Sequence, residues 1–198
     1  KMSNEIAKTY EEAAKKLQAL VVADNFDNKM PILTNDKWPQ CLQPLVNVPA
    51  LHYVIEFLIM NEVREIIIVT KSNLEMIKDF VKKQGYSQRG LGYKFKIIVR
   101  PIESDSASLG DALRQVADMD VIKDDFLLVR GDTITNMNVH AALKMHYFVK
   151  QEEDKKVNQL SESRKIKTIM TKLFVKMPPN SPRRDPAFTD LSLLLDEQ

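Results

Sequence analysis

A pair of carboxylates, Asp24 and Asp27, follows the first short apolar run, residues 17–22. A nucleotide site in a loop after a strand normally needs glycines, because backbone N–H groups must approach the phosphate closely. The five glycines of the chain all come later, at Gly85, Gly90, Gly92, Gly110 and Gly131. A carboxylate about 4 Å from a phosphate would instead cost on the order of 4 kcal/mol. The loop therefore disfavours phosphate unless a metal bridges the charges. Ordinary turn aspartates are an equally good interpretation.

A third carboxylate, Asp132, follows Gly131 directly after another apolar run, residues 126–129. At the carboxyl edge of a sheet, such a carboxylate could hold a hard cation that bridges phosphates. One carboxylate makes a weak site, however, and an aspartate can equally serve as a turn residue that accepts hydrogen bonds from nearby N–H groups. The sequence leaves both interpretations of Asp132 open.

Histidine and cysteine chemistry has no support in the sequence. His52, His140 and His146 fall on predicted helices without a matched serine or cysteine nucleophile nearby, so a catalytic triad is not predicted. Cys41 is the one cysteine, and no basic side chain stands beside it to lower its pKa. The sequence has no Cys/His cluster with zinc-site spacing. We therefore predict packing or surface roles for these residues, and neither a metal ion nor a cofactor.

The composition is that of a soluble domain. The chain has 198 residues, of which 44% are hydrophobic, and a formal net charge of +2. Basic pairs are scattered along the chain, which predicts solvated surface rather than a nucleic-acid interface. No window approaches ~18 consecutive apolar residues, and residues 1–16 are charged where a signal peptide needs an apolar stretch. We predict a cytoplasmic protein with no membrane association and no direct nucleic-acid binding.

The elements that position the carboxylates alternate between strands and helices. Parallel strands joined by right-handed crossover helices form a doubly wound sheet, whose ligands bind at the carboxyl ends of the strands. We therefore predict an α/β fold with a Rossmann-like, doubly wound, mostly parallel sheet. Its strands are predicted at residues 17–22, 65–70, 95–99 and 126–129, and its helices at residues 51–63, 72–84, 108–116 and 138–150.

Three helix starts have recognisable capping residues. Ser72 with Glu75 forms a predicted capping box, because the hydroxyl and the carboxylate can each accept from an otherwise unsatisfied helix N–H. Ser108 with Asp111 has the same spacing, and Asn138 is a good N-cap residue.

The last quarter of the sequence changes character. Residues 151–165 are polar, charged and without period, which predicts a flexible loop. Strands are predicted at 168–176 and at 191–195, separated by prolines that disfavour regular structure. Because the last strand ends close to Gln198, we expect an incomplete domain at residues 17–198, truncated at its C-terminal end. A helical extension is predicted at residues 1–16.

Four segments together resemble the sugar-nucleotide pyrophosphorylase family of nucleotidyltransferases: LQALVVADNF, WPQCLQPLVNVPALHYVIEFL, SLGDALRQV and DFLLVRGDTITN. The resemblance runs from residue 17 to about residue 150 and implies a nucleotidyltransferase-type fold. Active members have Ala-Gly-Gly-x-Gly-Thr-Arg where residues 23–29 read ADNFDNK. The lysine of their Pro-Lys-Pro-Leu-Leu-Pro motif corresponds to Gln40, and their metal-holding aspartate to Asp132. The resemblance therefore implies a degenerate site at Asp24, Asp27, Gln40 and Asp132, and no enzyme activity.

Within this family the pattern is most similar to a branch in the guanine-nucleotide exchange factor of eukaryotic translation initiation, whose first strand also runs into an Asp-x-Phe loop. That branch belongs to a multi-subunit factor that promotes GDP release from initiation factor 2 through a C-terminal helical domain. The resemblance implies an assembly and binding role here, chiefly with the gamma subunit and also with initiation factor 2. The alternatives are a working nucleotidyltransferase that uses Asp132 and Mg²⁺, or a domain that binds nucleotide or sugar phosphate without turnover.

Overall fold

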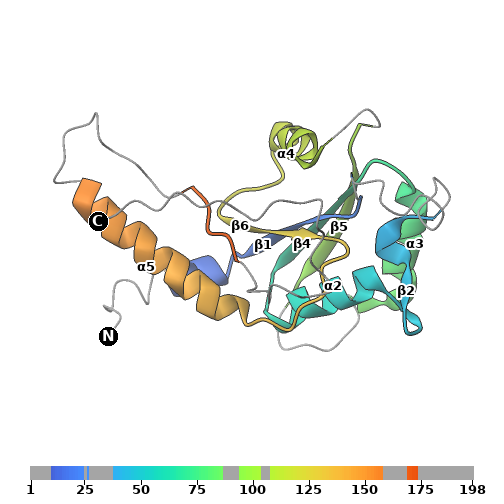
Figure 1. Ribbon diagram of the computed structural model, residues 1–198, viewed down its shortest axis with the longest axis horizontal. Coiled ribbons are helices and arrows are strands. Elements are labelled where there is room, and N and C mark those ends of the chain that lie inside the picture. The colour runs from blue at the N-terminus through green and yellow to red at the C-terminus, as the bar shows by residue number, and fades with distance from the viewer. Residues whose placement is uncertain are drawn as a thin grey trace, which may run out of the picture.

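The computed structural model describes residues 10–24, 26, 38–86, 94–103, 108–157 and 169–173. In these ranges a four-stranded sheet of order β5-β4-β1-β6 lies between helices (Figure 1). Each neighbouring pair of strands is parallel. The predicted doubly wound α/β sheet is thereby confirmed. Its strands are β1 (Gln18–Val22), β4 (Glu65–Thr70), β5 (Lys96–Pro101) and β6 (Phe126–Arg130).

The centre of the sheet is buried on both faces. All of β1 is buried, and in β4 every residue except Glu65 is buried. These strands are continuous apolar runs because helices cover both sides of a parallel sheet. Full burial of each valine or isoleucine side chain contributes roughly 1.5–3 kcal/mol. The two outer strands, β5 and β6, are only partly buried.

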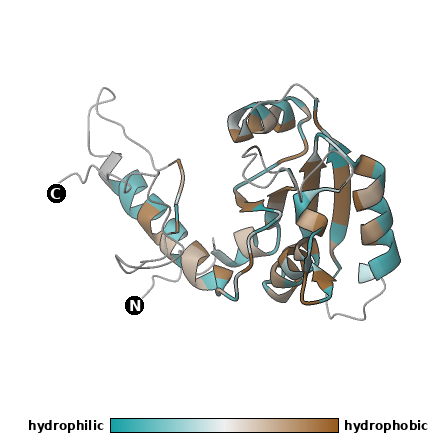
Figure 2. Ribbon diagram, turned by 45° about the vertical axis from the view of Figure 1, so that its right-hand side comes forward, coloured by the Kyte–Doolittle hydropathy of each residue, from teal (hydrophilic) through white to brown (hydrophobic). Residues whose placement is uncertain are grey.

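Helices cover the two faces unequally. On one face, α2 (Ala50–Met60) and α3 (Leu74–Gln84) pack against Val21 and Ile68. On the other face, α4 (Leu109–Asp118) packs against Leu20 and Ile67. Figure 1 shows α4 on the opposite side of the sheet from α2 and α3. Figure 2 shows the hydrophobic strands at the centre and the hydrophilic outer face of α3.

The start of α3 corrects one prediction. Its N-cap is Asn73, in the left-handed conformation with φ 57°, and no side chain caps the helix. The Ser72 hydroxyl instead donates to Asp24 Oδ1 at 3.1 Å, and Glu75 pairs with Lys78 at 2.8 Å. The capping box at Ser72 and Glu75 is therefore wrong, because a tertiary partner takes the serine hydroxyl away from the helix end.

The other two predicted caps are confirmed. The Ser108 hydroxyl accepts a hydrogen bond from Asp111 N at 3.2 Å, at the start of α4. Asn138 Oδ1 accepts from Ala141 N at 3.3 Å, at the start of α5 (Val139–Val157).

The C-terminal predictions need two corrections. Helix α5 reaches Val157, so residues 151–157 are helical rather than part of a flexible loop. Glutamate and lysine are good helix formers, and Glu152 pairs with Lys155 one turn later at 2.9 Å. Residues 169–173 form no strand, because no neighbouring strand pairs with them in the described ranges. Residues 158–165, and the predicted strand at 191–195, lie outside the described residues.

Two smaller features were not predicted. A 3₁₀ helix, η1 (Gln40–Leu42), leads into an antiparallel hairpin of β2 (Pro44–Leu45) and β3 (Val48–Pro49). Val46 at the hairpin turn has φ 61° and is 90% exposed. A β-branched residue at positive φ is an outlier, which is why the local sequence did not indicate this turn.

The segment before β1 packs on α5. Residues 10–14 are helical, whereas residues 1–9 lie outside the described part of the chain. The Tyr10 hydroxyl hydrogen-bonds His140 Nδ1 at 2.7 Å, and Lys144 Nζ lies 5.1 Å from the Tyr10 ring centroid. None of the helices in the described ranges has both the length and the hydrophobicity needed to cross a bilayer.

Candidate functional site

The chain reverses its direction of winding between β1 and β6. From β1 it winds outward through β4 to β5, and then returns to the opposite side of β1 to form β6. Val22 and Arg130, at the carboxyl ends of β1 and β6, are register partners. Ligands of doubly wound sheets bind at such a switch point.

A shallow hollow at this switch point collects the predicted site residues. Asp24, Gln40 and Asp132 line it, together with Val22, Ala23 and Gly131. The structure therefore brings together three positions that are far apart in the sequence. Asp27, the fourth predicted position, lies outside the described residues.

Gly131 fixes the turn that carries Asp132. Its N–H donates to the Val22 carbonyl at 2.8 Å. A Cβ at this position would lie 3.0 Å from both Ala23 Cα and Cys41 Cβ. The close approach of the turn to the loop after β1 therefore requires glycine, and it holds Asp132 at the edge of the hollow.

Asp132 is engaged by two neighbouring side chains. Arg130 donates from Nε to Oδ1 at 3.2 Å and from Nη2 to Oδ2 at 3.0 Å. Gln40 Nε2 also donates to Oδ2, at 3.3 Å. Both carboxylate oxygens thus accept hydrogen bonds from protein groups. Sequence reasoning missed Arg130, which is the last residue of β6, whereas Asp132 lies in the turn that follows.

Asp24 ties the loop after β1 to the end of β4. Its Oδ2 accepts from Lys71 N at 2.6 Å, and its Oδ1 accepts from the Ser72 hydroxyl. Nearby, Lys71 Nζ lies 5.5 Å from the Phe26 ring centroid. The interpretation of Asp24 as a residue that organises a turn fits these contacts.

Cys41 lies beneath the hollow and is 1% exposed. Burial raises the pKa of its thiol to about 12, and the nearby carboxylates of Asp24 and Asp132 add to the effect. The thiol therefore stays protonated at neutral pH, and a nucleophilic role has no basis. This agrees with the structural role that we predicted for Cys41.

The three histidines form contacts elsewhere in the fold. His52 Nδ1 hydrogen-bonds the Tyr86 hydroxyl at 2.6 Å, and His146 Nδ1 bonds the Thr171 hydroxyl at 2.8 Å. The bond of His140 to Tyr10 is described above. These contacts are between packed elements, in keeping with the predicted packing roles.

A hard divalent cation needs several oxygen ligands with free lone pairs. Here a guanidinium and an amide already occupy the Asp132 carboxylate. No group of three or more His, Cys, Asp and Glu side chains that could hold a metal ion occurs among the described residues. As arranged, these residues do not fit a bound divalent cation.

Comparison with known proteins adds family membership to this geometry. A family model described as nucleotidyl transferase matches residues 29–163. The chain belongs to the nucleotidyl transferase family. Its fold is similar to the crystal structure of HddC from Yersinia pseudotuberculosis, with a TM-score of 0.51 and 18% sequence identity. That match covers 65% of this chain and 53% of the other.

The curated relatives confirm the resemblance to the translation-initiation branch of the family. The chain is 38% identical over 130 residues to translation initiation factor eIF2B subunit epsilon of Dictyostelium discoideum. This match covers 66% of the chain. The chain is 28% identical over 120 residues to eIF2B subunit gamma of Schizosaccharomyces pombe, in a match that covers 61% of it. The matches span 18% and 25% of those relatives' own lengths. This chain is thus similar to the nucleotidyl transferase-like part of an epsilon subunit.

Proposed function

We propose that this chain is a non-catalytic assembly and binding domain in a subunit of a cytoplasmic guanine-nucleotide exchange factor that acts on translation initiation factor 2. The observation that carries the proposal is the engagement of Asp132 by Arg130 and Gln40. Asp132 stands at the position of the family's metal-holding aspartate. A carboxylate that is already bonded to a guanidinium has little capacity left for Mg²⁺.

The charge distribution supports the same proposal. Phosphoryl transfer depends on positioning and on positive charge that stabilises the transition state. The family's lysine is replaced by Gln40, whose neutral amide donates to Asp132 instead of to a phosphate. Asp24 adds a carboxylate where active members place glycines, so a phosphate there would be repelled rather than cradled.

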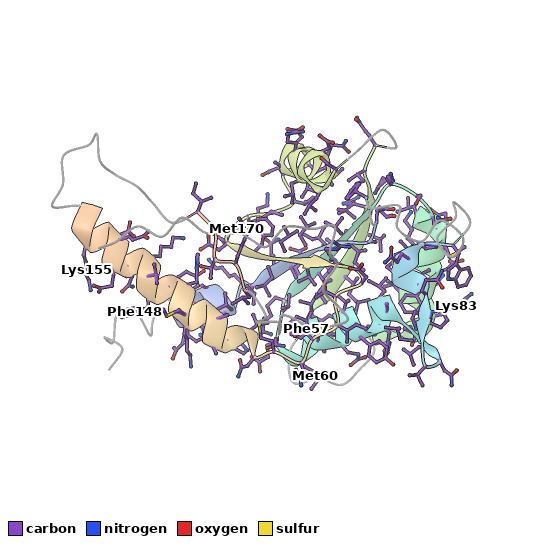
Figure 3. The ribbon with its side chains drawn as sticks, viewed as in Figure 1. Phe57, Met60, Lys83, Phe148, Lys155 and Met170 are labelled. Carbon is purple, nitrogen blue, oxygen red and sulfur yellow. The ribbon has the colours of Figure 1, made fainter. Side chains whose placement is uncertain are left out.

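Exposed apolar side chains offer surfaces for assembly. Met145 and Phe148 on α5 are 60% and 43% exposed. Figure 3 shows Phe148 and Lys155 on the part of α5 that extends away from the sheet. At the opposite end of the molecule, the hairpin turn exposes Leu45 and Val46. Apolar groups of this kind are common where a partner subunit binds.

The partners follow from the relatives. Both curated relatives are named as subunits of one initiation factor, and the gamma relative matches this chain itself. Two homologous domains in one factor make pairing of this chain with a gamma subunit the favoured arrangement. Initiation factor 2 would be the target of the assembled factor, and the exchange-active helical domain would lie elsewhere in the whole subunit.

Co-expression with the gamma subunit of the same organism tests this proposal. We expect the two chains to co-elute in size-exclusion chromatography with light scattering, at equal stoichiometry. Asp132→Asn should co-elute equally well, because assembly does not use the hollow. Separate elution at micromolar concentration would contradict the assembly role.

A parallel assay addresses the catalytic alternative, which family membership and the retained Gly131-Asp132 turn favour. The wild-type chain is incubated with nucleoside triphosphates, sugar phosphates and Mg²⁺, and pyrophosphate release is measured. We expect no release above the level of Asp132→Asn. Turnover that disappears in Asp132→Asn would establish a working nucleotidyltransferase and overturn the proposal.

A further inference from the structure

Arg130 holds Asp132 in a two-pronged contact. Nε and Nη2 each donate to a different carboxylate oxygen, at 3.2 and 3.0 Å. The fork of the guanidinium matches the geometry of the carboxylate. The Arg130 side chain is 48% exposed and that of Asp132 is 29% exposed. Stabilisation of the fold by such an exposed pair is small, so its main effect is on the electrostatics of the hollow.

The backbone positions of Arg130 and Asp132 are fixed by neighbouring elements. Arg130 is the last residue of β6 and is in register with Val22 of β1. The next residue, Gly131, is pressed against Ala23 and Cys41. Arg130 and Asp132 are therefore held at two fixed points, with Asp132 lining the hollow and Arg130 bonded to it.

The described lining of the hollow contains two carboxylates and no cationic side chain. Asp24 and Asp132 both line it, and Gln40 is the neutral side chain between the loops that carry them. Burial contributes most to the raised pKa of Cys41, and both carboxylates contribute further. The two carboxylates thus act electrostatically on one point beneath the hollow.

We propose that Arg130 is a built-in counter-cation that keeps divalent metal ions off Asp132. It donates to both oxygens of Asp132, and its charge would repel a second cation at contact distance. Loss of Arg130 alone would then leave the Asp132 carboxylate with the neutral Gln40 amide as its remaining side-chain partner among the described residues, and open it to a hard divalent cation. The inference rests on the proposed function in one respect, that Asp132 holds no metal in the native chain.

Mn²⁺ is the probe, because electron paramagnetic resonance measures the concentration of free Mn²⁺ directly. Arg130→Gln and Arg130→Thr remove the charge, and Thr also keeps strand propensity. Arg130→Lys keeps the positive charge and serves as the matched control. Arg130→Gln combined with Asp132→Asn shows whether any new binding uses Asp132. Because Arg130 is half exposed at a strand end, we expect all variants to fold, with circular dichroism and melting temperature as the check.

We expect no Mn²⁺ binding by wild type or Arg130→Lys within the range of the assay. Arg130→Gln and Arg130→Thr should bind Mn²⁺ at least about tenfold more tightly than the weakest affinity that the assay detects. The gain should vanish in the Asp132→Asn double variant. The inference is overturned if both uncharged variants bind Mn²⁺ no better than wild type, if the gain survives Asp132→Asn, or if wild type already binds Mn²⁺ through Asp132. A different measurement, nucleotide turnover by wild type, would overturn the proposed function. The two failures can therefore be told apart.

Discussion

The centre of the sheet and its carboxyl edge have diverged in what their residues do. At the centre, β1 and β4 retain the apolar packing that any member of this fold needs. At the edge, the three described site positions bond to protein groups: Asp24 to the end of β4, and Gln40 and Asp132 to each other, with Arg130 on Asp132. Apolar packing thus holds the centre of the sheet, whereas hydrogen bonds and an ion pair hold the described residues of its carboxyl edge.

The largest expected effect is in the centre. Ile68 is 0% exposed and packs with the α2 and α3 face, so Ile68→Ala should cost roughly 2–5 kcal/mol of unfolding free energy. The matched change on the outer strand is Leu128→Ala, which should cost about 1 kcal/mol or less, because Leu128 is 39% exposed. Urea denaturation measures both. Equal losses would show that the centre and the edge strand are not energetically distinct.

Gly131→Ala tests how rigidly the centre holds the edge. The added Cβ would meet backbone and side-chain carbon at 3.0 Å, so we expect a loss of roughly 1–3 kcal/mol. Gly110→Ala is the matched control: the nearest neighbour of its Cβ is Ser108 Oγ at 3.6 Å, and alanine is the better helix former. It should be neutral or slightly stabilising. A neutral Gly131→Ala in thermal melts would mean that the turn moves freely.

Asp132→Asn should leave stability nearly unchanged. The carboxylate is partly exposed, and ion pairs of this kind contribute at most about 1 kcal/mol. The change therefore separates the electrostatics of the hollow from the fold. A loss above about 2 kcal/mol in urea denaturation would instead make Asp132 a structural residue.

The smallest effect concerns the pH dependence of α5 docking. Burial raises the pKa of Asp125, but the Lys150 ammonium and the Tyr147 hydroxyl lower it by more, so it lies below its usual range. The stabilisation is therefore present above about pH 4, the unfolded value, and is lost as the pH falls through the lower folded value. Asp125→Asn should reduce the free energy of unfolding by only a few tenths of a kcal/mol at pH 7, because the pair is exposed. The variant should also lose less stability than wild type between pH 7 and pH 3. Denaturation curves at pH 7 and pH 3 measure both effects. An unchanged acid loss in the variant would contradict the assignment.

The sequence was sufficient for the regular part of the fold. Continuous apolar runs identified β1, β4 and β6, and the caps at Ser108 and Asn138 were correct, because each of these depends on local pattern. The box at Ser72 failed because its hydroxyl bonds a residue 48 positions away. The length of α5 was missed because charged residues without apolar period can still form a helix through their own ion pairs.

The sequence indicated which residues form the candidate site, but not the hydrogen bonds between them. Asp24 and Asp132 were singled out by their places after strands and Gln40 by the family resemblance, and the three meet in one hollow. The bond of Gln40 to Asp132 joins residues 92 positions apart, so no local pattern reveals it. Arg130 was overlooked because it ends an apolar strand, and its direction depends on the turn at Gly131.

The central claim is that the carboxyl edge no longer takes up nucleotide. Calorimetric titration of the wild-type chain with GTP, and with GTP plus a sugar phosphate, tests it directly when Mg²⁺ is present and Asp132→Asn is run in parallel. We predict no binding heat in either protein. Binding heat in the wild-type chain that disappears in Asp132→Asn would contradict the account, because it would show that Asp132 still serves a nucleotide site.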